Sequence, residues 1–414
     1  MWVTPFHFSI RKRPRPPFWP LRSTMKFIEE FQTPESVGPL IKALKRQVQP
    51  GGSYRFMEFC GGHTHSLFQT GLIDLLPREI TMVHGPGCPV CVLPSYPIEN
   101  SIALLEKNPS FVLATYGDLM RVPTSTGDSL LKAKGRGQKI LSLYSPLDAL
   151  EYAKKNPQKK VIFLAIGFET TIAPTTLVLD QAIREKVFNF SIYCNHLNTA
   201  YALQHILEKE SNSRRQGGFF LLDGLIGPGH VALITGAHFF ESFTKTFEKP
   251  IVISGFSPFD LAESLLMLVK QVNAGVFQTE VQYKRAVTGQ GNRIAQEMMS
   301  RYLTFRTSFY WRGLGRMEKS AFRIKEAWKN WDAEYLYDLP ERAGHDHPQC
   351  QCPKVLTGEK NPLDCKLFAT ACTPDHPLGA CMVSSEGACS AYYLSGQHLN
   401  NKNLIMGGQG SLGE

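Results

Sequence analysis

The sequence predicts an α/β protein in which two related Rossmann-like domains, each built on a parallel sheet, precede a loop-rich C-terminal domain. Three observations predict this fold class. Short apolar runs rich in β-formers recur along the chain and are usually followed by a helical pattern, as in parallel sheets. Two stretches of the chain resemble each other, and the C-terminal stretch combines little periodicity with six of the ten cysteines.

A chain of 414 residues exceeds one ordinary hydrophobic core, so we expect more than one domain. We place the first α/β domain at residues 25–156, the second at 157–300 and the C-terminal domain at 301–414. Residues 1–24 are basic and proline-rich and stand before Met25, which opens a plausible helix. We interpret them as a disordered leader or as a start codon placed too far upstream; a transit peptide is the alternative.

Eight strands are expected, four in each α/β domain, because each apolar run ends in residues typical of turns. Their ranges are 54–59, 80–84, 111–115 and 139–144 in the first domain, and 160–166, 188–194, 218–222 and 250–254 in the second.

The two α/β stretches share two motifs. CGGHTH at Cys60 aligns with IGFETT from Ile166, and YSPLDALEYA from Tyr144 aligns with FSPFDLAESL from Phe256. Two matches in the same order, at a repeat of roughly 110 residues, predict an internal duplication of one domain.

Charge and hydropathy exclude two classes of protein. The formal net charge is +9, but residues 1–24 carry five basic and no acidic residues, so the rest carries 9 − 5 = +4. Strong nucleic-acid binding is therefore not expected. No apolar run approaches the roughly 18 residues that a membrane span needs. Because no export signal is recognised either, we expect a cytoplasmic protein.

Reactive residues follow the first predicted strand, as expected for sites beyond the carboxyl ends of parallel strands. They are Cys60, Gly61, Gly62 and His63. Paired glycines let the backbone approach a ligand, and exposed amides beside an imidazole favour the thiolate that binds a soft metal. A buried cysteine in an ordinary turn remains the alternative for this motif alone.

A second thiol motif, GPGCPVC, follows the second strand and contains Cys88 and Cys91. Two thiols at this spacing can close a disulfide or clamp a metal. A structural zinc site needs a second CxxC pair, whereas Cys350 and Cys352 have one residue between them. Thiol redox chemistry is the preferred interpretation.

The C-terminal cysteines form a separate group, which suits metal binding better than disulfides in a reducing compartment. Cys350, Cys365, Cys372 and Cys389 are separated by fourteen, six and sixteen residues. Such a scattered set of four thiolates can hold an iron–sulfur cluster and organise a segment with little apolar content. Spacing leaves other sets open, since Cys352 and Cys381 can substitute or pack beside the cluster.

Weaker candidates follow the strands of the second domain. Each polar residue among them is more often a helix cap or a satisfied turn group than a ligand. Cys194 has apolar surroundings and is expected in the core. The candidates are Glu169, Asn195, His196, Asp223 and His230.

The ordered set FCGGHTH, GPGCPVCVLP, GFETT, DGLIGPGHV and CTPDHPLGACMVSSEGACSAYY resembles the HypD hydrogenase maturation family, over almost the whole chain after Met25. The resemblance implies two related α/β domains and a terminal domain with a [4Fe-4S] cluster. It also implies a redox-active scaffold, rather than a conventional turnover enzyme, on which the Fe(CN)₂CO unit of nickel–iron hydrogenases is assembled. The implied partners are a HypC-type chaperone and a HypE-type cyanide donor.

Roles carried over by motif make Cys60 the ligand of the transient iron, His63 its neighbour, and Cys88 with Cys91 the redox pair. Glu386 is an accessory residue. The implied cluster ligands are Cys350, Cys365, Cys372 and Cys389.

Two other classes of function remain open at this point. One is a general thiol oxidoreductase that uses CPVC, and the other is a docking scaffold whose tail is folded by a structural metal. The sequence contains no P-loop and no dinucleotide fingerprint, so nucleotide-driven chemistry is not expected.

Overall fold

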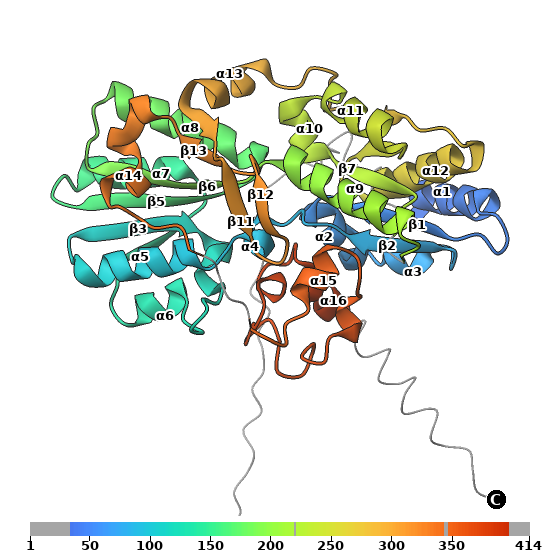
Figure 1. The fold of residues 1–414 in the computed structure, drawn as a ribbon, viewed down its shortest axis with the longest axis horizontal. Coiled ribbons are helices and arrows are strands. Elements are labelled where there is room, and N and C mark those ends of the chain that lie inside the picture. The colour runs from blue at the N-terminus through green and yellow to red at the C-terminus, as the bar shows by residue number, and fades with distance from the viewer. Residues whose placement is uncertain (1–33, 219–220, 343–346, 397–414) are drawn as a thin grey trace, which may run out of the picture.

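The computed structural model describes residues 34–218, 221–342 and 347–396. Two parallel sheets lie side by side with helices on their faces, and a loop-rich segment lies against both (Figure 1). The leader expected at residues 1–24 lies outside the described residues. The predicted fold class, parallel α/β with a loop-rich C-terminal region, is confirmed.

Every neighbouring pair of strands in the two sheets is parallel. The first sheet has the order β2-β1-β7-β8-β9, and the second has the order β4-β3-β5-β6. The strands of the first sheet are β1 (Tyr54–Glu58), β2 (Ile80–His84), β7 (Gly224–Pro228), β8 (Ile251–Ser254) and β9 (Thr279–Val281); those of the second are β3 (Phe111–Tyr116), β4 (Ile140–Leu143), β5 (Lys160–Gly167) and β6 (Phe190–His196).

The sheets do not follow the division expected between residues 156 and 157. β3 pairs with β5 across that boundary, and β7 and β8 return to the first sheet beside β1. The reason is that a parallel strand is reached through a long crossover, which can carry the chain to either sheet. Hydrophobic patterning shows that a strand exists but not which neighbour it joins.

One expected strand is displaced. Residues 219 and 220 of the run expected at 218–222 lie outside the described residues, its other residues are not in a strand, and β7 begins at Gly224. The carboxylate of Asp223 accepts a hydrogen bond from the Arg55 backbone N–H at 2.7 Å, and Asp223 N–H donates to the Arg55 carbonyl. The β1–β7 ladder therefore starts only after this side-chain contact, and the buried residues of GLIGP form the strand.

Both sheets wind in the same way, which supports two related domains. In each, the second strand in chain order lies outside the first, and the third lies on the other side. The order places a topological switch point between β1 and β7 and another between β3 and β5, and in parallel sheets the crevice for a ligand forms at such a point. The matched sequence motifs occupy different places in this order, because CGGHTH follows β1 whereas IGFETT follows β5. Those matches therefore reflect local turn chemistry rather than equivalent strands.

Helices cover both sheets, and short helical turns lie in the connections. They are α1 (Pro34–Gln47), α2 (Gly61–Gln69), α3 (Leu72–Leu75), α4 (Pro89–Val92), α5 (Tyr96–Lys107), η2 (Gly117–Arg121), α6 (Leu130–Gly135), α7 (Pro146–Lys155), α8 (Glu169–Arg184), α9 (Thr199–Arg215), α10 (Gly229–Thr235), α11 (His238–Phe247), α12 (Pro258–Ala274), α13 (Arg293–Tyr302), η3 (Glu326–Trp331), α14 (Ala333–Leu336), α15 (Cys352–Leu356), η4 (Pro362–Asp364), η5 (Ala380–Met382) and α16 (Ala388–Leu394). Within the described ranges, none of these helices combines the length and apolar character that crossing a membrane requires.

A hairpin between the two sheets holds them together (Figure 1). It consists of β11 (Ser308–Trp311) and β12 (Gly315–Glu318), and it is flanked by the pair β10 (Leu303–Phe305) and β13 (Phe322–Ile324). Trp311 is fully buried against the ring of Phe168, which follows β5. The backbone N–H of Arg312 donates to the carbonyl of Val92, the last residue of α4, at 2.7 Å. The hairpin thus contacts elements that follow strands of both sheets.

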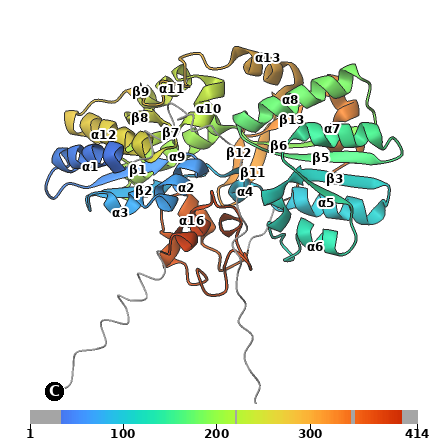
Figure 2. The same cartoon turned by 180° about the vertical axis from the view of Figure 1, so that it is seen from behind.

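The remaining described residues, 347–396, form a cysteine-rich segment of short helical turns. Figure 2 shows this segment from behind, against α2 and beside α4. Arg121, after β3, donates hydrogen bonds to the carbonyls of Pro374 and Val383, and Ser384 donates to Asp118 at 2.7 Å. The segment is therefore fastened near the carboxyl ends of strands, where parallel sheets build their sites.

Candidate functional site

Cys60 lies at the crevice between β1 and β7, where it is the N-cap residue of α2. The His63 N–H donates to the Cys60 carbonyl at 2.9 Å, and the backbone N–H groups of Gly62 and His63 favour the charged form of the sulfur. Burial, followed by the negative charge of Glu386, raises the pKa of the thiol to about 12. The thiol therefore keeps its proton at neutral pH unless a cation takes the proton's place, as a metal does when it binds.

Three backbone segments meet at Cys60, and glycines allow the close approach. A Cβ on Gly61 would lie 2.6 Å from Cβ of Glu386, and a Cβ on Gly87 would lie 2.5 Å from the Cα and N atoms of Cys60. The CGGH turn, the GPGC loop and the SSEG stretch of the cysteine-rich segment thus converge. The paired glycines were expected to let the backbone approach a ligand; in the structure a Cβ on Gly61 would meet Glu386, and one on Gly62 would meet the Phe256 ring at 3.1 Å.

His63 is fully buried in the first turn of α2. Its Nε2 lies 3.4 Å from the Ser254 carbonyl, and its ring stacks on Phe256, which in turn stacks on His230 at 3.7 Å between centroids. Burial lowers the pKa of His63 to about 4, so the ring is neutral. With Nε2–H facing Ser254, Nδ1 is an acceptor that has no hydrogen-bond partner among the described residues.

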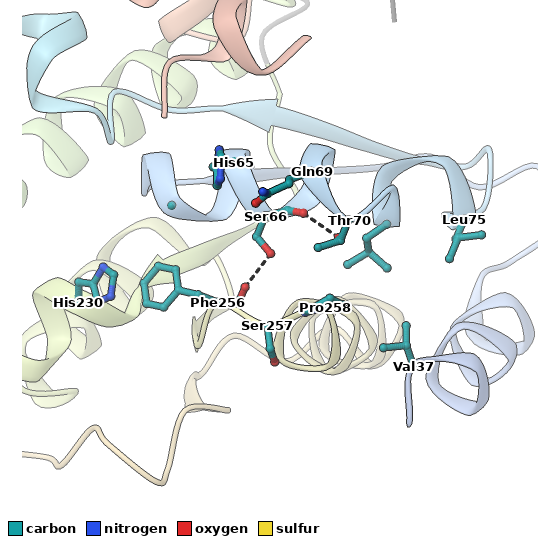
Figure 3. Close-up of a pocket in the computed structure, with 12 residues that line it drawn as sticks. Val37, His65, Ser66, Gln69, Thr70, Leu75, His230, Phe256, Ser257 and Pro258 are labelled. Atoms are coloured by element: carbon teal, nitrogen blue, oxygen red, sulfur yellow. Dashed lines mark hydrogen bonds between the residues drawn. The ribbon is translucent and has the colours of Figure 1, made fainter. Parts of the chain in front are cut away.

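A cavity of about 840 Å³ opens beside this motif, between α2, α1 and the start of α12 (Figure 3). Ser66 donates to the Phe256 carbonyl at 2.6 Å and fixes one wall against the other. Gly62 lines the cavity, and a Cβ on Gly62 would lie 3.8 Å from the Cys60 sulfur. The cavity therefore reaches the residue that lies between it and the Cys60 sulfur, and His65 and His230 lie in its wall.

The CPVC turn lies in the loop that approaches Cys60. Cys88 is the N-cap residue of α4, Cys91 lies in that helix, and the two thiols contact each other. Both side chains are buried, at 3% and 0% exposure, and burial raises the pKa of both. The pair has the proximity that a disulfide needs, and it is shielded from large molecules.

The Cys91 thiol contacts Cys381 of the cysteine-rich segment, and Cys381 contacts Cys352. Cys352 in turn contacts Cys350 and Cys389. A continuous series of thiols therefore joins the CPVC turn to the C-terminal cysteines. Sequence analysis had offered Cys352 and Cys381 only as substitutes or packed neighbours.

The four predicted cluster ligands gather around one small pocket, which we call the cluster pocket. Leu367, Phe368 and Met382 supply apolar walls. No group of three or more His, Cys, Asp and Glu side chains in the described ranges is arranged to hold a single metal ion. A [4Fe-4S] cluster would need four thiolates, one for each iron, and five cysteines line this pocket. The cysteines that line the pocket are Cys350, Cys352, Cys365, Cys372 and Cys389.

Glu386 lies at the meeting point of the three segments. Its pKa is raised, mainly by burial and then by the charge of Asp118. The closeness of Gly61 places its side chain beside the Cys60 turn. Only the family resemblance had indicated this residue, because nothing in a loop of small residues reveals which distant turn it will contact.

The candidates after the strands of the second predicted domain separate into two groups. Glu169 accepts hydrogen bonds from the N–H and hydroxyl of Thr199, and His196 Nε2 lies 3.0 Å from the Thr175 hydroxyl, so both are buried internal contacts. Asn195 is buried in β6, and Asp223 pairs with the Arg55 backbone, as described above. Only His230 reaches the cavity beside Cys60.

The expectation that Cys194 is a core residue is confirmed. Its thiol is buried and faces the carbonyl of Phe322 at 3.7 Å.

Two residues beside the site were missed. Glu58, the last residue of β1, accepts a hydrogen bond from the Cys60 N–H at 3.0 Å. His84, the last residue of β2, lies 2.9 Å from the same carboxylate. The sequence contained a signal for both residues. Glu58 in MEF and His84 in MVHG each end an apolar strand, and a polar residue at such a place must find a hydrogen-bond partner when it is buried.

Comparison with known proteins agrees with this geometry. The sequence model of a family described as "HypD: Hydrogenase formation hypA family" matches residues 35–396. The chain is 48% identical to hydrogenase maturation factor HypD2 of Bradyrhizobium diazoefficiens over 373 residues, which cover 90% of this chain and 97% of the relative. It is 48% identical to HypD of Cupriavidus necator over 374 residues (90% and 98%) and 39% identical to HypD of Escherichia coli over 374 residues (89% and 98%). The chain therefore belongs to the HypD family of hydrogenase maturation factors.

Proposed function

We propose that this protein is the scaffold on which the Fe(CN)₂CO unit of nickel–iron hydrogenases is assembled, with the transient iron held by Cys60. The observation that carries the proposal is the surroundings of that thiol, which is half-buried at the N-terminus of α2 and is met by the loop of the CPVC turn and by Glu386. Burial holds the proton on the sulfur, so a soft cation that displaces it gains a thiolate in a partly dry site. Iron that carries cyanide and carbon monoxide is such a cation.

Cys350, Cys365, Cys372 and Cys389 would hold a [4Fe-4S] cluster in the cluster pocket, where it would supply one-electron steps. The apolar walls and the closely packed Gly379, whose Cβ would lie 2.6 Å from the Cys350 sulfur, support a compact sulfur-ligated group at this place.

The CPVC turn would act as a two-electron reservoir beside the iron. When Cys88 and Cys91 join as a disulfide, the two thiols release two electrons and two protons. Their mutual contact and the close approach of Gly87 to Cys60 support this role. The series Cys91, Cys381, Cys352 gives the dithiol sulfur neighbours toward the cluster pocket.

A HypC-type chaperone and a HypE-type cyanide donor would approach from solvent through the cavity beside α2. That cavity is large enough for a peptide segment, it combines polar residues such as Gln69 and Ser66 with apolar ones such as Val37 and Leu75, and it reaches the residue that lies between it and the Cys60 sulfur. In this proposal the terminal cysteine of the chaperone shares the iron with Cys60. Burial of Cys88 and Cys91 disfavours the alternative of a general thiol oxidoreductase, because a protein disulfide needs access to one sulfur.

The test is the double variant Cys88→Ser/Cys91→Ser, purified anaerobically with the partner proteins. Infrared bands of iron-bound cyanide and carbon monoxide should be absent, while iron and acid-labile sulfide of the cluster stay at the wild-type level. Cys194→Ser is the matched control, because it removes a buried thiol outside the site and should load normally. Normal loading in the double variant would contradict the redox role.

A further inference from the structure

A fully buried carboxylate lies behind the Cys60 turn. Both oxygens of Glu58 are engaged, since Oε2 accepts from the Cys60 N–H at 3.0 Å, and Oε1 accepts from the Thr64 hydroxyl and from Nδ1 of His84. Burying a carboxylate costs free energy that only complete hydrogen bonding offsets. Here that bonding joins the turn before α2, the helix itself and the neighbouring strand.

The network continues from the first sheet into the cysteine-rich segment. Glu58 and His84 are register partners on β1 and β2, so their side chains leave the sheet on the same face. With Nδ1–H of His84 donated to Glu58, Nε2 accepts from the Tyr392 hydroxyl at 3.4 Å. That hydroxyl also accepts from Asn361 Nδ2 at 2.9 Å.

Tyr392 belongs to α16, one helical turn after Cys389, which lines the cluster pocket. Packing reinforces the link, because the Phe68 ring lies 4.4 Å from the Tyr392 ring and 5.6 Å from the His84 ring, between centroids. Phe68 is part of α2, whose N-cap residue is Cys60. Hydrogen bonds and aromatic contacts thus join the same two helices.

We infer that Glu58, His84 and Tyr392 are positioning residues that hold the Cys60 turn in a fixed place relative to the helix carrying Cys389. None of the three is placed to touch an iron at the Cys60 sulfur, since Glu58 acts on the Cys60 amide, and His84 and Tyr392 act through Glu58. The inference takes the importance of Cys60 from the proposed function, but its test needs neither iron loading nor partner proteins.

The test compares Tyr392→Phe with Tyr54→Phe. The first removes only the hydroxyl of the positioning chain. The second removes the hydroxyl of another buried tyrosine, at the other end of β1, which donates to Asn273 at 2.7 Å and accepts from the Gln49 N–H at 3.1 Å. Two rates are measured on anaerobic protein: amide exchange of the peptide 58–64, and alkylation of Cys60 by iodoacetamide. Because Cys60 is half-buried, a looser turn exposes its sulfur, so both rates should rise.

In Tyr392→Phe we expect both rates to rise by about fivefold, the factor expected for the loss of one typical buried hydrogen bond. Tyr54→Phe should keep the wild-type rates at Cys60 despite a similar loss of thermal stability. Glu58→Gln combined with Tyr392→Phe should give less than the product of the two single effects, since both act on one chain.

Wild-type rates in Tyr392→Phe would overturn the inference, and so would an equal acceleration in Tyr54→Phe, because loosening would then be general. Absence of iron loading on the wild-type protein would instead remove the proposed function and leave these rates unaffected. The two failures are therefore distinguishable.

Discussion

Replacing Gly87 by alanine tests whether the contact between the GPGC loop and the Cys60 turn is essential. The added Cβ would lie 2.5 Å from Cα and N of Cys60, whereas ordinary contacts begin at 3.4 Å, so the two backbones must separate by about 0.9 Å. The two atoms of Cys60 that the new Cβ meets belong to the backbone, so they cannot rotate away as a side chain can. Overpacking of this kind lowers the free energy of unfolding by ~1–3 kcal/mol.

Urea or guanidinium unfolding of anaerobic protein measures that loss, and infrared spectroscopy of the loaded complex measures its effect on assembly. The control is Gly38→Ala in α1, where the new Cβ meets nothing within 4 Å and helix propensity should raise stability by roughly 0.5–1 kcal/mol. Gly87→Ala should also load less iron with cyanide and carbon monoxide, because the CPVC turn moves with the loop. A Gly87→Ala protein as stable and as well loaded as wild type would refute the packing argument.

Two further predictions concern acid stability and the cluster pocket. Burial lowers the pKa of His196 to about 4, so the unfolded chain binds the proton more tightly. The free energy of unfolding is therefore complete above pH ~6.5 and falls by up to ~1.4 kcal/mol per pH unit down to the pKa of the folded state. In His196→Gln, the unfolding temperature should depend less on pH over this range. A pH dependence equal to that of the wild type would contradict the assignment. Gly379→Ala places a Cβ 2.6 Å from the Cys350 sulfur and 2.7 Å from that of Cys352, so acid-labile sulfide per chain should fall, and wild-type sulfide would count against the packing.

The sequence was sufficient for seven of the eight expected strands, which overlap β1 to β6 and β8, but it did not predict β9 or the strands of the hairpin region. The expected strand 80–84 matches β2, because an apolar run bounded by turn residues has few other solutions. Cys60 and Cys88 were each expected beyond the carboxyl end of a strand, and the parallel pairing of β1 with β2 puts these two ends at one edge of the sheet. The sequence did not predict which sheet each strand joins. That depends on the sheet to which each crossover leads the chain, such as the crossover that brings β7 back beside β1.

The contacts that the sequence did not reveal are all non-local. Cys381 lies between Cys91 and Cys352 only because the cysteine-rich segment folds back onto both sheets. The pairing of Glu58 with His84 requires the register of β1 and β2, which a shift of one residue would abolish. Local patterns carry no information on either.

The central claim is that four C-terminal cysteines hold a [4Fe-4S] cluster and leave Cys60 free for the iron that is assembled. Iron, acid-labile sulfide and electron paramagnetic resonance after reduction test it on anaerobic wild-type protein, Cys365→Ser and Cys60→Ser. Wild type and Cys60→Ser should carry about four iron and four sulfide per chain, and Cys365→Ser should lose them. Zinc without sulfide in the wild-type protein, or loss of the cluster in Cys60→Ser, would contradict the claim.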